Sequence, residues 1–178
     1  MMHRIAKHLA RFGRKEDGHA TIEFAIMFPF FFVFILSSVE IGLITLKYAF
    51  LERGLDIAVR EVRLSTGDAP DHVELKNLIC DEATFIDNCA ENLSLEMVQV
   101  DPRNWVPISD QATCTDRAEE VQPVTTFTPG QANQLMILRV CAKVPALYPT
   151  MGFGKEIAKD TSGDIALVSV SAFVQEPS

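Results

Sequence analysis

The chain has 178 residues, of which 48% are hydrophobic, and a formal net charge of −8. The first twenty residues hold five basic and two acidic side chains, which leaves eleven basic and 22 acidic side chains on the remainder. This acidic excess excludes a binder of nucleic acid or of another polyanion, so we expect no nucleic-acid partner. Roughly 110 residues follow the long helix predicted near the N-terminus, which is enough for one small domain with a core but not for two.

A basic segment and then a long apolar stretch begin the chain. Residues 24–39 carry no charge, Glu40 interrupts, and residues 41–46 are apolar again apart from Gly42 and Thr45. As a helix, residues 24–46 would extend roughly 34 Å, which is sufficient for a hydrocarbon core of about 30 Å. We therefore predict a single transmembrane helix whose membrane part is about residues 24–46.

The charges before this helix set its orientation. Short basic segments beside a span stay in the cytoplasm, so the N-terminus is predicted to be cytoplasmic and the rest of the chain exported. The basic side chains concerned are Arg4, Lys7, Arg11, Arg14 and Lys15.

Helical spacing continues beyond the span. Leu51, Leu55, Ala58 and Val62 recur at three and four residues, which predicts one long helix over residues 19–66. The glycine and proline in the segment 66–70 end this helix, and Asp71 is placed to cap a second short helix that runs to about Cys80.

Three strands are predicted in the exported part, over about residues 93–101, 134–146 and 164–174. Their alternation is typical of an antiparallel sheet with one covered face, which would pack on the exported part of the long helix. We thus expect an α+β domain over residues 67–178. The apolar face of the second strand comprises Met136, Leu138, Val140, Ala142 and Val144, and that of the third comprises Ala166, Val168, Val170, Ala172 and Val174. Residues 102–130 and 145–154 are predicted as loops.

Four cysteines, all on the exported side, indicate two disulfides. The gaps between Cys80, Cys89, Cys114 and Cys141 are eight, 24 and 26 residues, which does not suit the paired ligands of a zinc site, so we expect no metal. Three connectivities are possible. We favour Cys80 with Cys89, which closes a short excursion, and Cys114 with Cys141, because Cys141 lies on the strand face over which the loop carrying Cys114 could pass.

Glu23 is the charged residue that most needs an explanation, because it begins the apolar stretch. A carboxylate costs ~2.5 to 3.5 kcal/mol at mid-membrane and less near an interface. Cleavage after Gly18 would give His19 a new amine about one helical turn from Glu23, able to pair within the chain or with a neighbouring subunit. Alternatively, Glu23 extends to the interface beside the basic segment. Glu40 is expected near the outer interface, with Lys47 on a similar face.

The motif formed by these residues resembles a known family. Gly18-His19-Ala20-Thr21-Ile22-Glu23-Phe24 matches the cleavage pattern of type IV prepilins, and the helix that follows, with Val39-Glu40-Ile41-Gly42, is similar to TadE-like minor pseudopilins. The segments 80–93 and 172–177 are also similar to members of that family, so the resemblance covers nearly the whole chain but is specific mainly in its first 45 residues.

The resemblance implies a minor pseudopilin of the tight-adherence (Flp) pilus, held in the bacterial inner membrane with a periplasmic domain until it enters a pilus. It implies removal of the leader, residues 1–18, by a prepilin peptidase. The implied partners are other pilins and pseudopilins through the N-terminal helix, the peptidase, the pilus assembly platform and membrane lipid. Major Flp pilins have much shorter mature chains, which favours a minor component.

We expect no enzyme and no cofactor, because no nucleophile has a base recognisable from spacing and no phosphate loop is present. Two alternatives keep the membrane segment but not the pilus. One is a single-pass anchored binding domain that is never cleaved. The other is a secretory signal peptide, although the helical pattern continues to Val62 and no small-x-small site follows.

Overall fold

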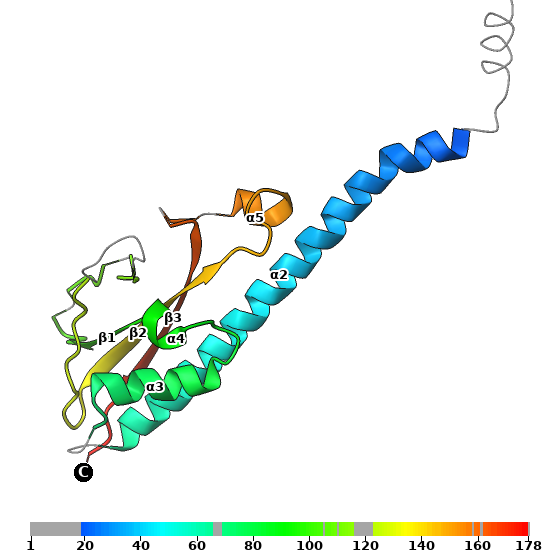
Figure 1. Cartoon of the computed structure of the whole chain (residues 1–178). Coiled ribbons are helices and arrows are strands. Elements are labelled where there is room, and N and C mark those ends of the chain that lie inside the picture. The colour runs from blue at the N-terminus through cyan, green and yellow to red at the C-terminus, as the bar shows by residue number, and fades with distance from the viewer. Residues whose placement is uncertain are drawn as a thin grey trace, which may run out of the picture.

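The computed structural model describes residues 19–65, 69–104, 106–109, 111–115, 123–157, 159–160 and 162–177. One long helix runs from a free, apolar end into an α+β domain that lies along its second half (Figure 1). The elements are α2 (His19–Leu64), α3 (His72–Glu82), α4 (Cys89–Asn92), β1 (Leu93–Val100), β2 (Leu135–Pro145), α5 (Gly152–Glu156) and β3 (Asp164–Val174). The α+β class and the antiparallel sheet predicted from the sequence are confirmed.

Helix α2 has 46 residues and changes character along its length. Residues 19–35 are exposed on all sides, whereas the domain covers one face of the helix from about Ser37 onward. The residues predicted to line that face are all buried, because they recur with the helical period and form one stripe: Leu51, Leu55, Ala58 and Val62. The helix ends at Leu64, close to the predicted end, and residues 66–68 lie outside the described part of the chain.

Helix α3 packs across α2 and begins where the sequence predicts. The Asp71 carboxylate accepts the backbone N–H of Glu74 at 2.8 Å, and the Glu74 side chain in turn accepts the N–H of Asp71, forming a capping box. The two helices approach closely at Gly54, where an added Cβ would lie 2.7 Å from the carbonyl oxygen of Ile79. Glycine therefore sets the crossing distance of α2 and α3.

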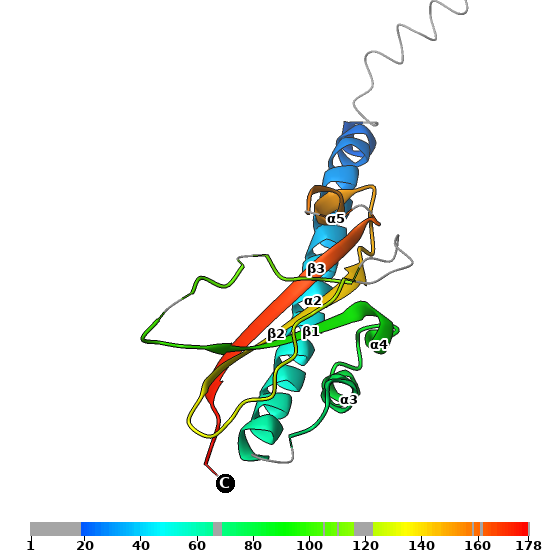
Figure 2. The ribbon, with the colours of Figure 1, turned by 90° about the vertical axis from the view of Figure 1, so that its left-hand side faces the viewer.

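The three strands form one antiparallel sheet in the order β1-β2-β3, which covers the C-terminal half of α2 (Figure 2). Both strand pairings are fixed over their full lengths, with Met97 opposite Leu138 and Leu138 opposite Ser171. The face turned to the helices carries the core. Its buried members in β1 and β2 are Leu93, Leu95, Met97, Met136, Leu138, Val140, Ala142 and Val144, and the β2 residues are those predicted.

The predicted core face of β3 is wrong. Ala166, Val168, Val170, Ala172 and Val174 are exposed, and the residues between them, Ile165, Leu167, Ser169 and Phe173, are buried. Directly opposed residues lie on the same face of a sheet. Because the buried Val140 is opposite Ser169, the face of β3 that carries Ser169 is turned to the core. Ser169 faces α2 there, where it lies near the Tyr48 hydroxyl.

Two predicted loops contain more structure than the sequence indicated. Within residues 102–130, Phe127 forms a parallel bridge to β1, where Met97 N–H donates to Thr126 O (2.8 Å) and Thr128 N–H donates to Met97 O (3.0 Å). The loop predicted over 145–154 runs into the short helix α5. This helix is the part of the domain that lies furthest toward the free end of α2 (Figure 1).

Candidate assembly site on the N-terminal helix

Gly18, the residue before the predicted cleavage point, lies outside the described residues, and His19 begins α2. Glu23 follows one turn later. Both side chains are exposed, and within the described residues no hydrogen bond or ion pair is formed by Glu23. The folded domain therefore leaves this end of the helix free for contacts with other molecules.

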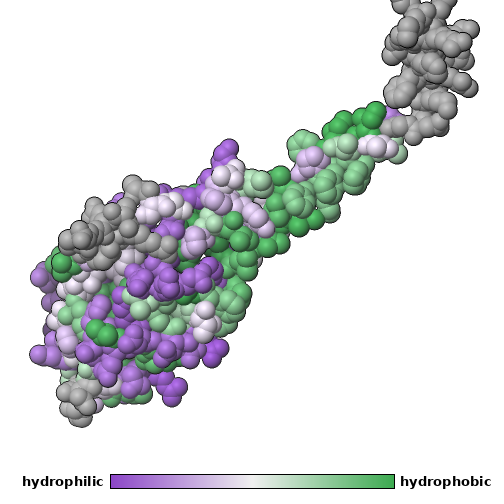
Figure 3. Space-filling view, in the orientation of Figure 1, coloured by the Kyte–Doolittle hydropathy of each residue, from purple (hydrophilic) through white to green (hydrophobic). Residues whose placement is uncertain are grey.

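Large apolar side chains surround the helix after Glu23 (Figure 3). No residue of the most apolar 18-residue window is buried by the rest of the chain, and the helix is long and apolar enough to cross a membrane. Along one side, the Phe28 ring lies tilted against that of Phe24 and stacked on that of Phe32, at centroid distances of 5.2 and 5.9 Å. Phe24 is nevertheless 64% exposed, so these rings contact each other without being buried. A surface of this kind requires lipid or other apolar helices around it.

Glu40, which the sequence predicts near the outer membrane interface, is buried within the chain. Only 1% of the residue is exposed, and its Oε1 accepts the backbone N–H of Tyr148 at 3.1 Å. Gly154 of α5 lies directly against the carboxylate, where an added Cβ would be 2.2 Å from Oε1. The polypeptide between β2 and β3 thus covers the charged group.

Ser37, one turn before Glu40, contacts the same segment. Its Oγ accepts the N–H of Phe153 at 3.1 Å and donates to Val33 O at 2.9 Å. Gly152 adopts φ = +60°, and an added Cβ there would lie 2.6 Å from this Oγ. Two polar side chains of α2 therefore hold two backbone N–H groups of one turn. Sequence reasoning could have noted a serine and a glutamate three residues apart on one helix face, but not a partner more than 100 residues away.

The structure contains two disulfides, Cys80–Cys89 and Cys114–Cys141, with Cα separations of 5.6 and 5.2 Å. These are the two pairs that the sequence favours. The first joins the end of α3 to the start of α4. The second ties the segment that follows β1 to the outer face of β2, opposite the core.

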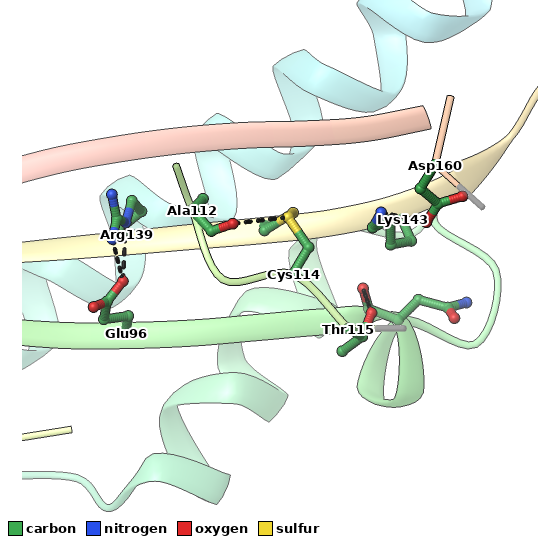
Figure 4. The surroundings of a disulfide bond; sticks show 9 residues. Glu96, Ala112, Cys114, Thr115, Arg139, Lys143 and Asp160 are labelled. Atoms are coloured by element: carbon green, nitrogen blue, oxygen red, sulfur yellow. Dashed lines mark hydrogen bonds and ion pairs between the residues drawn. A yellow bond between two sulfur atoms is a disulfide. The ribbon is translucent and has the colours of Figure 1, made fainter. Parts of the chain in front are cut away.

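Buried ion pairs flank the second disulfide (Figure 4). Arg139 of β2 donates to Glu96 of β1 from Nε (2.9 Å) and Nη2 (2.5 Å), and from Nη1 to Ser109 O (2.6 Å). Lys143, two residues beyond Cys141 on the same strand, forms an ion pair with Asp160. Charges on this face are therefore matched with partners.

Asp160 also organises the turn before β3. Its Oδ1 accepts the backbone N–H groups of Ser162 (3.0 Å) and Asp164 (2.9 Å). Burial alone would raise the pKa of Asp160, but the hydrogen bond from Lys143 and those from the two backbone N–H groups outweigh it and lower the pKa below its ordinary value.

Among the residues that the structure describes, no group of three or more His, Cys, Asp or Glu side chains could hold a metal ion. His72 lies with its Nε2 3.3 Å from Leu95 O and its ring edge-on to Phe127. Its surroundings are those of a packed side chain between α3 and the sheet.

Comparison with known proteins gives one match. The family model of the TadE-like protein matches residues 18–60, which contain Glu23, the exposed apolar segment, Ser37 and Glu40. No curated protein matches the chain, and no solved structure matches it. The TadE-like family suggests involvement in the Tad pilus. Residues 18–60 of this chain are therefore similar to the TadE-like family, which is consistent with a TadE-like protein of the Tad pilus system.

Proposed function

We propose that the chain is a minor pseudopilin that takes part in assembly of a Tad (Flp) pilus. A prepilin peptidase removes the leader after Gly18, and α2 holds the protein in the bacterial inner membrane. The N-terminus is cytoplasmic and the disulfide-bonded domain is periplasmic. Other pilins and pseudopilins, the peptidase and the assembly platform are its partners, and its role is to make contacts rather than to catalyse a reaction.

The observation that carries this proposal is the uncovered N-terminal part of α2, residues 19–35. Its own domain buries none of the most apolar window, although α2 continues unbroken into the domain core. A helix with this surface is suited first to lipid and then to the packed helices of a filament, because both surroundings are apolar. The family match begins at residue 18, where the proposed mature chain begins.

Glu23 gives the proposed packing its register. After cleavage, the amine of His19 lies about one turn from Glu23, within reach of its own carboxylate or of the carboxylate of a neighbouring helix. A charge that enters an apolar helix bundle without a partner is penalised, so subunits that place amine and carboxylate together are favoured. The exposure of Glu23 in the single chain is compatible with this pairing.

Two experiments test the proposal. The intact mass of the protein from membranes should show a chain that begins at His19, whereas retention of residues 1–18 would leave the uncleaved anchored binding domain as the better reading. Glu23→Gln should insert and be cleaved but support few pili. Breaking one side of a desolvated charge pair costs ~3 to 5 kcal/mol, which corresponds to two or more orders of magnitude in incorporation.

A matched control is available on the same helix. Glu61 is exposed near the other end of α2, so Glu61→Gln removes a charge without touching the proposed contact. Pili are counted by electron microscopy in a strain that lacks the native copy. Equal piliation by the Glu23→Gln and Glu61→Gln variants would refute the role of Glu23.

A further inference from the structure

The domain contacts α2 at a level where a spanning helix is still within the membrane. From Phe24 to Glu40 the helix rises about 24 Å, less than the hydrocarbon thickness of about 30 Å. If the membrane instead began at His19, Glu40 would lie about 32 Å along the helix, at the outer boundary. Tilting the helix lowers its rise across the bilayer and moves Glu40 deeper. In each case the segment held by Ser37 and Glu40 is placed at or below the outer surface of the bilayer.

This segment, residues 146–157, which we name the docking turn, carries side chains suited to that position. Leu147 is 51% exposed and Met151 is 45% exposed, although both are large and apolar. Tyr148 and Phe153 are half-buried between the turn and the helix. The charged residues of the docking turn are Lys155 and Glu156, so its net charge is zero and it lacks the acidic excess of the rest of the exported chain. Apolar and aromatic side chains with little net charge are typical of the boundary between headgroups and acyl chains.

The docking turn also covers the Glu40 carboxylate. A carboxylate at this depth is costly when it faces lipid. Here the backbone of Tyr148 donates to it and Gly154 closes against it, so that 1% of the residue remains exposed. A side chain at position 154 would occupy the place of the carboxylate oxygens. The same segment therefore shields the charge on its inner side and presents apolar groups on its outer side.

We propose that the docking turn lies in the outer headgroup and acyl boundary of the bilayer, with Leu147 and Met151 in contact with lipid, and that Ser37 and Glu40 fix it at that depth. The proposal rests on the membrane anchoring by α2 proposed above. Its consequence is that the domain sits on the membrane in a defined orientation before assembly, instead of swinging above it on a free helix. The apolar surface of α2 and that of the turn then form one continuous lipid-facing region.

Fluorescence of single tryptophans in liposomes tests this directly. The full chain carrying Trp105→Phe receives one new tryptophan, as Met151→Trp or Leu147→Trp, and is reconstituted in phosphatidylcholine and phosphatidylglycerol vesicles with or without brominated acyl chains. Phe30→Trp, at a position 73% exposed in the apolar half of α2, is the membrane control. Val73→Trp, at a position 62% exposed on α3, is the aqueous control.

Tryptophan at 151 or 147 is expected to emit at shorter wavelength than tryptophan at 73 and to be quenched by the brominated lipid. Unquenched emission from both turn positions, with tryptophan at 30 quenched, would overturn the docking turn while leaving the anchor in place. Unquenched emission from position 30 would instead refute the anchoring on which the proposal rests.

The holding contact has its own test in detergent micelles. Gly154→Ala displaces the Glu40 carboxylate, so tryptic cleavage after Lys155 should be faster than in the unchanged protein. Gly42→Ala on the same helix adds a Cβ that meets nothing within 4 Å and should leave the cleavage rate unchanged. Equal cleavage rates in all three proteins would show that Glu40 and Gly154 do not fix the turn.

Discussion

Replacing Gly54 with alanine tests whether the crossing of α2 and α3 supports the domain. In a helix that had room for the methyl group, alanine would stabilise by roughly 0.5 to 1 kcal/mol relative to glycine. Here the added Cβ would lie 2.7 Å from Ile79 O and 3.3 Å from Ile79 Cα, and these are backbone atoms that no rotamer change can move. Ile79 is fully buried, and its neighbour Cys80 is tied to Cys89. The whole of α3 must therefore move outward.

Overpacking of this kind costs about 1 to 3 kcal/mol, which exceeds the gain in helix propensity. We expect Gly54→Ala to lower the free energy of unfolding by about 1 to 2 kcal/mol. For a domain of this size, that corresponds to a fall in Tm of roughly 5 to 10 °C.

The assay is thermal unfolding of the full chain in detergent micelles, followed by near-UV circular dichroism. Gly42→Ala is the matched control, because it is the same substitution on the same helix at a position with no atom within 4 Å. Its Tm should not fall. If Gly54→Ala unfolds at or above the temperature of the unchanged protein, the close approach of α2 and α3 does not limit the packing and the reasoning fails.

Three further predictions concern the α+β domain. Peptide mapping without reductant should find Cys80 joined to Cys89 and Cys114 joined to Cys141, and loss of the bridges should cost up to about 2.7 and 3.6 kcal/mol from their loop lengths; four free thiols would contradict this. Glu96→Gln should lower the free energy of unfolding by about 2 kcal/mol, because Arg139 stays buried with one neutral partner, whereas Arg53→Gln, which removes the exposed pair with Glu82, should cost less than about 1 kcal/mol by denaturant titration. Because the pKa of Asp160 is lowered, its contribution to stability is present above its unfolded pKa of about 3.9 and is lost as the pH falls through the folded value. The stability difference between the unchanged protein and Asp160→Asn should therefore shrink on acidification. A difference that grew would contradict the lowered pKa.

Local patterns in the sequence were sufficient for the long helix, the second helix and the three strands of the fold. The helical period from Leu51 to Val62 identified the buried stripe of α2, Asp71 identified the start of α3, and strict alternation identified β2 and its core face. Each of these signals lies within one element, where side-chain direction follows from the backbone period alone. The apolar length of residues 24–46, which predicts the membrane helix, is also a local property.

What the sequence could not decide depended on contacts between distant segments. The inward face of β3 follows from its register against β2, since a shift of one residue exchanges the two faces and both faces of this strand hold apolar residues. The burial of Glu40 follows from the N–H of Tyr148 and from the absence of a side chain at Gly154, both more than 100 residues away along the chain. A charged residue in an apolar helix indicates that a polar partner is needed, but which group supplies it is determined by the tertiary structure.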